Sequence, residues 1–202
     1  MLWGNAGDKV ATFRKLRDSG GSTILLGMNE VNEPSQANLD VSTGISLWNA
    51  EIRPYGLKGF TLVSPAVTSA PSGITWFQGF FKDCGDYDGQ AHCGVDFLAV
   101  HYYGNTAEGL ISYLEKFWQT FGIPIWLTEF ACQDFTGKNN QCDSGQVWAF
   151  METATSWMDS TDYVHAYFAF GILHDMWNVN YLNQLMSSNC SPTSLGYFYI
   201  NS

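Results

Sequence analysis

Short apolar runs alternate with helical patterns along almost the whole chain, and this alternation limits the folds that the sequence can adopt. Five runs are typical of buried strands: TILLGMN (23–29), FTLVSPAV (60–67), DFLAVHYY (96–103), IPIWLTEF (123–130) and VHAYFAFG (164–171). The segments around them carry apolar residues at helical spacing, over 8–17, 43–53, 74–82, 106–121 and 146–158. Continuous apolar strands separated by such helices favour a parallel sheet covered by helices.

The number of predicted strands and the chain length can be compared with those of a (β/α)8 barrel. The opening residues MLWG add a weaker sixth strand, and no linker, repeat or low-complexity tract divides the 202 residues. A closed (β/α)8 barrel has eight strands and typically about 250 residues. We therefore expect a single α/β domain over residues 1–202, a TIM-like (β/α)8 barrel that is incomplete, with about six of its eight strands.

Composition argues against several classes of partner. Nine basic against nineteen acidic side chains give a net charge of -10, which repels nucleic acid and anionic membranes. Aromatic residues make up 16% of the chain and charged residues 14%, which suits a neutral ligand such as a sugar polymer. No apolar run is long enough to span a bilayer, and residues 1–10 lack a secretory signal pattern. We expect no nucleic-acid partner and no membrane partner.

Four of the five cysteines form two pairs that each flank a polar loop: Cys84 with Cys93, and Cys132 with Cys142. Their spacings match no zinc pattern and no histidine falls at ligand spacing, so we expect two local disulfides, typical of an exported protein, and no bound metal. Free thiols or a metal site are the alternative. Cys190 is left over, inside the formal glycosylation sequon Asn189-Cys190-Ser191.

Two of the predicted strands end in glutamate. Glu30 follows TILLGMN, and Glu129 lies near the end of IPIWLTEF. In parallel barrels the catalytic groups lie at the carboxyl ends of strands. Glycoside cleavage needs such a pair, one carboxyl protonated to donate to the leaving oxygen and one ionised to attack or to activate water. The alternative is that each glutamate is only a polar strand end.

Five segments, taken in order, carry a family resemblance. They read LLGMNE…QANL, LVSPAVTS, FLAVHYYG, PIWLTEFAC and FG…NVNYLNQLM…LGYFYI. Together they resemble glycoside hydrolase family 128, a group of fungal and bacterial β-1,3-glucanases also called the glycosyl hydrolase catalytic core. The resemblance covers nearly the whole chain. It implies a TIM-like barrel, retaining chemistry, β-1,3-glucan as the substrate, and no metal or organic cofactor.

The family pattern carries over onto individual residues. It reads Leu-Gly-aromatic-or-Met-Asn-Glu, five variable residues and Gln-Ala-Asn-Leu, and it implies that Glu30 is the acid/base and that Asn29 hydrogen-bonds the sugar 2-hydroxyl. The nucleophile is implied at Glu129. The family often has Pro directly after the acid/base, where this chain has Val31. Asn-Glu recurs three residues later, before Pro34, so Glu33 is the alternative acid/base, although it lies in a loop.

Four more side chains are expected near the sugar. His101 and Tyr103 end the strand between the two acid-bearing strands, from where they could hydrogen-bond Glu129 or the sugar. Trp126 and Trp177 are candidate platforms for a sugar face. The alternatives are a structural histidine at 101 and a core tryptophan at 126.

The leading interpretation is an endo-β-1,3-glucanase that hydrolyses β-1,3-glucan polysaccharide or oligosaccharide by double displacement, secreted or held in the cell wall. A β-glucan-binding protein without turnover is the alternative from a different class, because aromatic content and a cofactor-free acidic surface suit both. A β-glycosidase of another linkage is a further alternative, since two carboxyl groups do not encode linkage.

Family members have two strands before the segment that matches MLWG, so the resemblance implies that the first two β-α units are absent. A fragment, a short variant or strands supplied by another chain would each account for this. Two open sheet edges and several hundred Å² of exposed apolar interior would cost on the order of 10 kcal/mol, comparable to the stability of a domain.

We therefore predict that residues 1–202 alone self-associate through exposed barrel edges or aggregate. Size-exclusion chromatography and thermal melting test this prediction. A monomeric, cooperatively melting and active chain of this length contradicts it.

Overall fold

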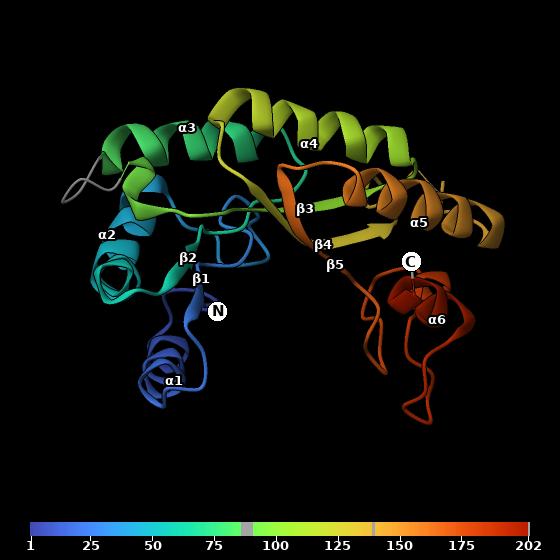
Figure 1. Cartoon of the computed structure of the whole chain (residues 1–202), viewed down its shortest axis with the longest axis horizontal. Helices are drawn as coiled ribbons and strands as arrows, with labels where there is room; N and C mark the ends of the chain where they lie inside the picture. Colours follow the sequence, from blue (N-terminus) through green and yellow to red (C-terminus); the bar gives the residue numbers. More distant parts are fainter. Residues whose placement is uncertain (86–90, 139, 202) are drawn as a thin grey trace. The chain divides into compact units, whose positions relative to one another are not determined.

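Parallel strands and helices alternate along the chain, so the predicted α/β class is confirmed (Figure 1). The computed structural model describes residues 1–85, 91–138 and 140–201. The chain divides into unit 1 (Met1–Val100) and unit 2 (His101–Ser202). Within the described ranges, every helix is too short or too polar to cross a bilayer.

Unit 1 is built around two short parallel strands. It contains α1 (Gly7–Asp18), β1 (Ile24–Leu26), α2 (Val41–Glu51), β2 (Thr61–Val63), α3 (Ser72–Cys84) and 3-10 turns at Arg53–Lys58 and His92–Gly94. β1 and β2 pair in register from Ile24 opposite Thr61 to Leu26 opposite Val63. The helix α2 begins at its N-cap Asp40, whose carboxylate accepts from the Thr43 amide. Val63 at the end of β2 forms a parallel bridge with Phe97, and Val67 forms one with Val100 in β3 (Leu98–Gly104).

Large aromatic side chains fill the core of unit 1. Trp48 on α2 and Phe80 on α3 are fully buried, with ring centroids 6.0 Å apart and an edge-to-face geometry. The Trp48 indole donates to the Cys93 carbonyl at 3.0 Å, and Cys93 is joined to Cys84 by a disulfide. The disulfide therefore fixes the Cys93 carbonyl that accepts from the buried Trp48 indole. It also joins the two ends of the segment between Cys84 and Cys93.

The predicted strand at residues 1–4 is wrong, because these residues are not in a strand. The Leu2 amide donates to Leu26, and the Asn29 amide donates to Trp3. In a regular parallel ladder the amide and the carbonyl that face one neighbour belong to the same residue, whereas here Leu2 donates and the adjacent Trp3 accepts, so a regular ladder does not form. The segment still packs beside β1, and Leu2 is fully buried.

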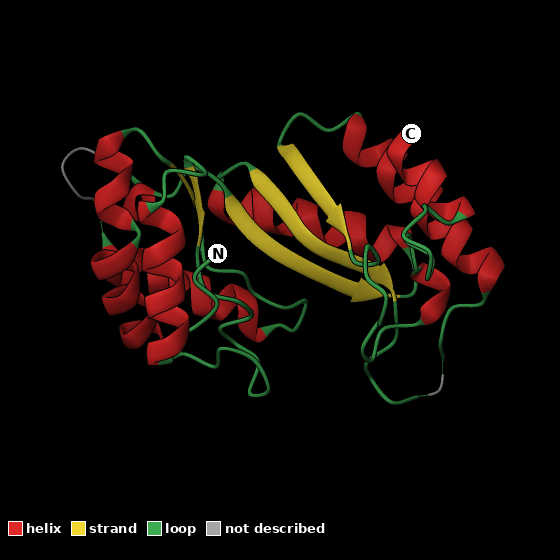
Figure 2. Ribbon diagram, turned by 90° about the horizontal axis from the view of Figure 1, so that it is seen from below, coloured by secondary structure: helices red, strands yellow, loops and turns green. Residues whose placement is uncertain are grey.

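Unit 2 contains a three-stranded parallel sheet in the order β3-β4-β5. Its remaining elements are α4 (Ala107–Phe121), β4 (Ile125–Cys132), α5 (Ser144–Asp159), β5 (Val164–Ala169), a 3-10 turn at Tyr181–Asn183, and α6 (Ser194–Asn201). The strands lie side by side with helices across one face (Figures 1 and 2). Asp143 and Gln146 form a capping box that starts α5. The second predicted disulfide, Cys132–Cys142, is present, so both disulfide predictions are confirmed.

The helix α6 has no counterpart among the predicted helices. It has eight residues, and within it only Leu195 and Gly196 are buried, so its sequence carries little amphipathic signal. Tyr199 instead anchors it to β5. Its hydroxyl donates to the Tyr167 carbonyl at 2.9 Å and accepts from the Ala169 amide at 3.2 Å.

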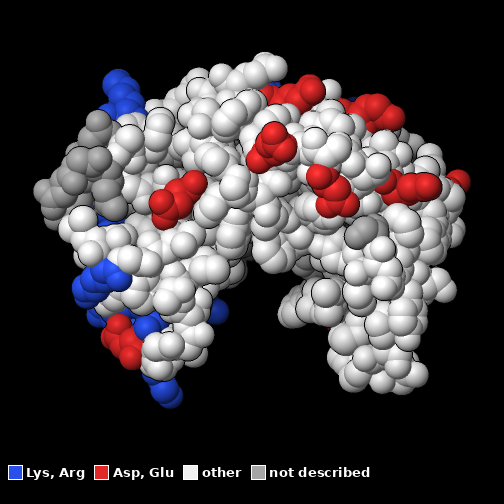
Figure 3. All heavy atoms as spheres, in the orientation of Figure 1, with Lys and Arg blue, Asp and Glu red and all other residues white. Residues whose placement is uncertain are grey.

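Charge is distributed unevenly between the units. Residues 101–202 carry nine acidic and two basic side chains, and the other seven Lys and Arg belong to residues 1–100. Acidic side chains lie over α4 and α5, whereas basic ones gather near α1 (Figure 3). Unit 2 therefore accounts for most of the net negative charge of the chain, because nine acidic and two basic side chains leave -7 of the total of -10.

Glu51, at the end of α2, is the buried charge that joins α2 to α1. Its carboxylate forms a bidentate ion pair with Arg14 and a second one with Arg17 at 3.3 Å. Hydrogen bonding from Arg14 holds the pKa of Glu51 below its ordinary value. The charged form of Glu51 is therefore the form that stabilises unit 1.

We predict that Glu51→Gln lowers the free energy of unfolding by about 1.5–3 kcal/mol at pH 7, because charge-assisted hydrogen bonds to two guanidinium groups are lost. Since the pKa of Glu51 is depressed in the folded state, this contribution is present above the carboxyl pKa of the unfolded chain and is lost as pH falls through the folded value. Urea unfolding at pH 7 and at about pH 3 measures the difference.

Glu152→Gln, on the exposed face of α5, is the matched control and should change stability little. A difference in the free energy of unfolding between wild type and Glu51→Gln that stays constant down to low pH contradicts this account.

Candidate active site

Glu30 lies four residues beyond β1 in a backbone conformation that is unusual for glutamate. Its φ is +45°, in the left-handed region, and its side chain is buried, with 8% of the residue exposed. An L-residue in this region costs roughly 1–2 kcal/mol. Such strain persists only where the surroundings impose it.

The surroundings are a set of backbone hydrogen bonds that continue after the β1–β2 ladder ends. Gly27 donates to Val63, and Ala66 donates to Met28. The chain also approaches very closely here, since a Cβ on Gly27 would lie 2.4 Å from the Pro65 nitrogen. Only glycine permits this approach. The glycine of LLGMNE thus allows residues 27–31 to pack directly on the chain after β2.

The side chains on either side of Glu30 hold the same loop. Asn29 is buried, and its amide donates to the Gln36 side chain at 3.1 Å. Asn32 donates to the Thr68 hydroxyl at 2.8 Å and accepts from the Thr68 amide at 2.9 Å. Glu33 is only half-buried and accepts from Ser35 two residues away. In the second Asn-Glu copy, Asn32 thus holds the loop against Thr68, and Glu33 forms hydrogen bonds with a residue two positions along the chain.

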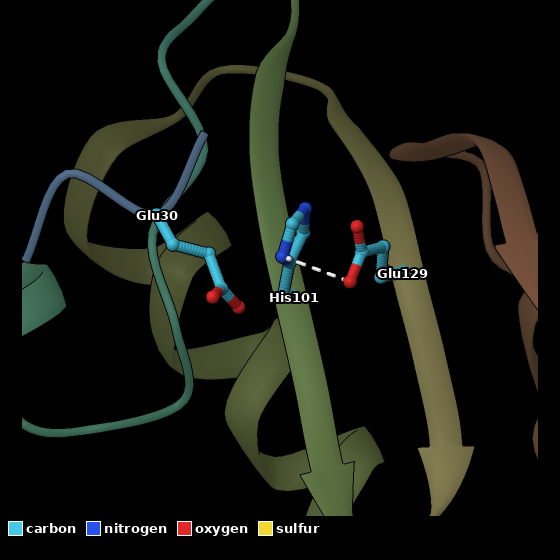
Figure 4. Close-up of side chains that lie close together, drawn as sticks. All are labelled: Glu30, His101 and Glu129. Carbon is cyan, nitrogen blue, oxygen red and sulfur yellow. Dashed lines mark ion pairs between the residues drawn. The ribbon is translucent and has the colours of Figure 1, made fainter. Parts of the chain in front are cut away.

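Glu129 lies on β4 and is contacted by two side chains from β3. The Tyr103 hydroxyl donates to Glu129 Oε2 at 2.6 Å. His101 Nδ1 lies 3.5 Å from the same oxygen, and Figure 4 shows the contact between these two side chains. His101 is 1% exposed, whereas the Glu129 side chain is 31% exposed. The carboxylate is therefore oriented from the protein side while it remains open to a ligand.

A β-bulge in β4 aims Glu129. Leu127 pairs with Tyr167 and Phe130 pairs with Ala169, so three steps along β4 correspond to two steps along β5. Leu127 and Phe130 are both fully buried, and the two residues between them are partly exposed. The extra residue turns Glu129 away from the helices that cover the sheet, a role that bulges often have beside functional sites.

The two candidate sugar platforms have different surroundings. Trp126 is half-buried on β4, and its ring centroid lies 5.8 Å from that of Phe168 on β5. Trp177 is 75% exposed, with φ +56°, and its amide donates to Asp175. Trp177 is thus free to meet a ligand face, whereas Trp126 packs largely within unit 2.

Three features of the surroundings were not predicted from the sequence. Gln36, the partner of Asn29, is the Gln of the quoted QANL segment, so the motif itself carried that signal. Phe135 and Phe170 pack edge-on against Tyr103, with centroids at 5.1 and 6.1 Å, and they hold the ring that binds Glu129. The bulge in β4 leaves no signal in the apolar pattern.

Family and sequence comparisons place the chain among known proteins. The family model described as glycosyl hydrolase catalytic core matches residues 1–199. A curated relative, alkali-sensitive linkage protein 1 of Schizosaccharomyces pombe (strain 972 / ATCC 24843), is 30% identical over 188 residues. That alignment covers 91% of this chain and 33% of the relative, so the chain spans about a third of the relative's length.

Solved structures of glycoside hydrolase family 128 are similar over most of the chain. A subgroup V exo-β-1,3-glucanase from Cryptococcus neoformans is 28% identical with a TM-score of 0.79, covering 93% of this chain and 74% of that one. A subgroup I endo-β-1,3-glucanase from Amycolatopsis mediterranei, bound to laminaritriose, is 28% identical with a TM-score of 0.78, covering 98% and 79%. A subgroup VII oligosaccharide-binding protein from Cryptococcus neoformans is 25% identical with a TM-score of 0.80, covering 100% and 77%.

These similarities agree with the family resemblance of the five sequence segments. The similar structures include an exo-acting and an endo-acting β-1,3-glucanase and an oligosaccharide-binding protein. Because the family model extends over almost the whole sequence, the chain belongs to the glycosyl hydrolase catalytic core family, and its structural neighbours include the β-1,3-glucanases of glycoside hydrolase family 128.

Proposed function

We propose that the chain is an endo-β-1,3-glucanase that retains the anomeric configuration, with Glu129 as the nucleophile and Glu30 as the acid/base. The observation that supports this best is the Glu129 carboxylate, which Tyr103 and His101 contact at Oε2 while the side chain stays partly exposed. Oε1 is then the oxygen that attacks. Glu30 is supported by its buried position after β1 and by its strained backbone.

The proposed reaction has two displacements. Glu129 Oε1 attacks the anomeric carbon while protonated Glu30 donates its proton to the leaving glycosidic oxygen. A covalent glycosyl-enzyme forms, and Glu30 then removes a proton from the water that hydrolyses it. This chemistry requires carboxyl groups about 5–5.5 Å apart in the catalytic state. Asn29 is proposed to hydrogen-bond the sugar 2-hydroxyl, and Trp126 and Trp177 to contact sugar faces.

The proposal extends to the substrate, the fold and the location of the chain. Relatives that are β-1,3-glucanases or that bind laminaritriose support β-1,3-glucan as the ligand. The acidic surface suits a neutral polymer. We propose that residues 1–202 form one catalytic domain with an incomplete TIM-like barrel, consistent with parallel strands each followed by a helix. The two disulfides support a secreted or cell-wall location.

A second candidate function is glucan binding without turnover. It is favoured by one observation, the 25% identity of the chain to an oligosaccharide-binding protein with a TM-score of 0.80. Binding needs the aromatic surface but no acid/base pair. Incubation with laminarin separates the two, since a binding protein retains the glucan and releases no reducing sugar.

We predict that Glu30→Gln lowers the rate of laminarin hydrolysis by about 10²–10⁴-fold, the contribution of general acid–base catalysis. Glu129→Gln should lower it at least as much, because the covalent intermediate is lost. Reducing-sugar release measures both rates, and product length separates endo from exo action. Glu33→Gln is the matched control and should stay active.

Azide separates the two roles further. A small external nucleophile should rescue Glu129→Ala with an α-glycosyl azide product and Glu30→Ala with a β-glycosyl azide product, since each replaces a different step. Full activity in both variants disproves the assignment. An active Glu30→Gln beside an inactive Glu33→Gln moves the acid/base to the second motif copy.

The strained backbone at position 30 yields an independent prediction. Both Glu30→Ala and Glu30→Gly remove the carboxyl group, but only glycine adopts a positive φ without a steric cost. We expect Glu30→Gly to be more stable than Glu30→Ala by about 1 kcal/mol. Urea unfolding of the two variants measures this difference.

The same pair at Glu33, whose φ is not positive, is the control. There the order should reverse, with glycine less stable by about 0.4–1 kcal/mol, because glycine raises the entropy of the unfolded chain. An alanine variant at position 30 that equals or exceeds the glycine variant contradicts the strain.

A further inference from the structure

An exposed turn near the C-terminal end of unit 2 presents the sequon that the catalytic proposal leaves unused. Met186 and Pro192 close the turn with an antiparallel bridge, and the Ser187 amide donates to the Ser191 carbonyl at 2.8 Å. Asn189 is exposed within it. It belongs to the one Asn-X-Ser/Thr sequence of the 202 residues, Asn189-Cys190-Ser191.

The Asn189 side chain is held by its oxygen. Oδ1 accepts from the Ser187 hydroxyl at 2.7 Å and from the Ser191 amide at 3.1 Å. Both bonds use Oδ1 and neither uses Nδ2, and the residue is exposed. Nδ2 is the atom that an N-linked sugar modifies. The turn therefore fixes the side chain without using the reactive nitrogen.

The middle residue of the sequon, Cys190, is a free and exposed thiol. Its Sγ lies 3.5 Å from Nε2 of His174, and it lines a pocket of about 150 Å³ whose other walls are mostly apolar, including the exposed Ile172 and Ile200. The other four cysteines of the chain form two disulfides. An exposed thiol in an oxidising compartment can pair with another thiol or exchange with a disulfide.

We propose that Asn189 carries an N-linked glycan and that this glycan covers the Cys190 thiol. Asn189 Nδ2 forms a bond to the anomeric carbon of the first sugar of a lipid-pyrophosphate-linked oligosaccharide. The lipid pyrophosphate leaves with the electron pair, and the amide nitrogen loses one proton. The proposal rests on the proposed export of the chain and not on its chemistry on glucan. Because Asn189 and Cys190 are adjacent in the sequence, the first sugars would lie beside Cys190 and the mouth of its pocket.

Expression of residues 1–202 behind a secretion leader in a yeast tests the proposal. The secreted chain should be heavier by one oligosaccharide, and peptide N-glycosidase should remove it. Ser191→Ala should lack the sugar, and it should keep the turn, because Ser191 contributes backbone atoms to the bonds that form it. Cys190→Ser preserves the sequon and should keep the sugar. Secreted wild type without a glycan overturns the proposal, whether or not the chain hydrolyses laminarin.

Reaction of Cys190 with a bulky maleimide tests the shielding. We expect labelling to be several-fold faster in Ser191→Ala, and in wild type after enzymatic removal of the sugar, than in the glycosylated chain. Enzymatic removal acts on the folded protein, so this arm does not depend on the folding of a variant. Cys190→Ser sets the background. Equal rates with and without the sugar overturn the shielding.

Discussion

The backbone of residues 27–31 has to satisfy its hydrogen bonds after β1 has already ended, and the position of Glu30 depends on how it does so. β1 has only three residues, yet the pairing with the chain after β2 continues from Gly27 to Val31, whose amide donates to Ala66. A buried amide left unpaired costs about 1–3 kcal/mol, so the bonds outweigh the local strain of one left-handed residue. The loop is fixed by its backbone, and the side chain of Glu30 follows from that.

In unit 2 a different irregularity has the same effect. Regular alternation along β4 would place Glu129 on the face that contains Leu127, which the helices cover. The bulge inserts one residue and brings Phe130 to that face instead, so that Glu129 faces Tyr103 and His101. Each candidate carboxylate therefore lies where regular strand pairing is interrupted. Glu30 lies beyond the end of the β1–β2 ladder, and Glu129 lies between the two pairs that flank the bulge in β4.

This arrangement explains which features the sequence could reveal. Apolar runs and helical stripes depend on burial, which is periodic, so five strands and five helices were predicted near their observed places. Other features depend on single contacts between residues that are distant in sequence, and such contacts leave no periodic pattern in the sequence. They are the bulge in β4, the positive φ of Glu30 and the helix α6. The glutamates themselves were found because acidic residues at the ends of apolar runs are conspicuous. Gln36, which accepts from the neighbouring Asn29, was present in the quoted motif, but its role as a partner could not be read from the sequence.

Burial alone does not distinguish a functional glutamate, as Glu51 illustrates. It is as buried as Glu30, yet two arginines bind it, and hydrogen bonding from Arg14 lowers its pKa. A carboxylate locked in this way stays ionised and has both oxygens occupied, so it can neither donate a proton nor attack a sugar. Glu129 instead meets a phenol and an imidazole at Oε2, and its side chain stays partly exposed. The identity of the partner, more than the degree of burial, separates the glutamate that holds two helices together from the one that we propose as the nucleophile.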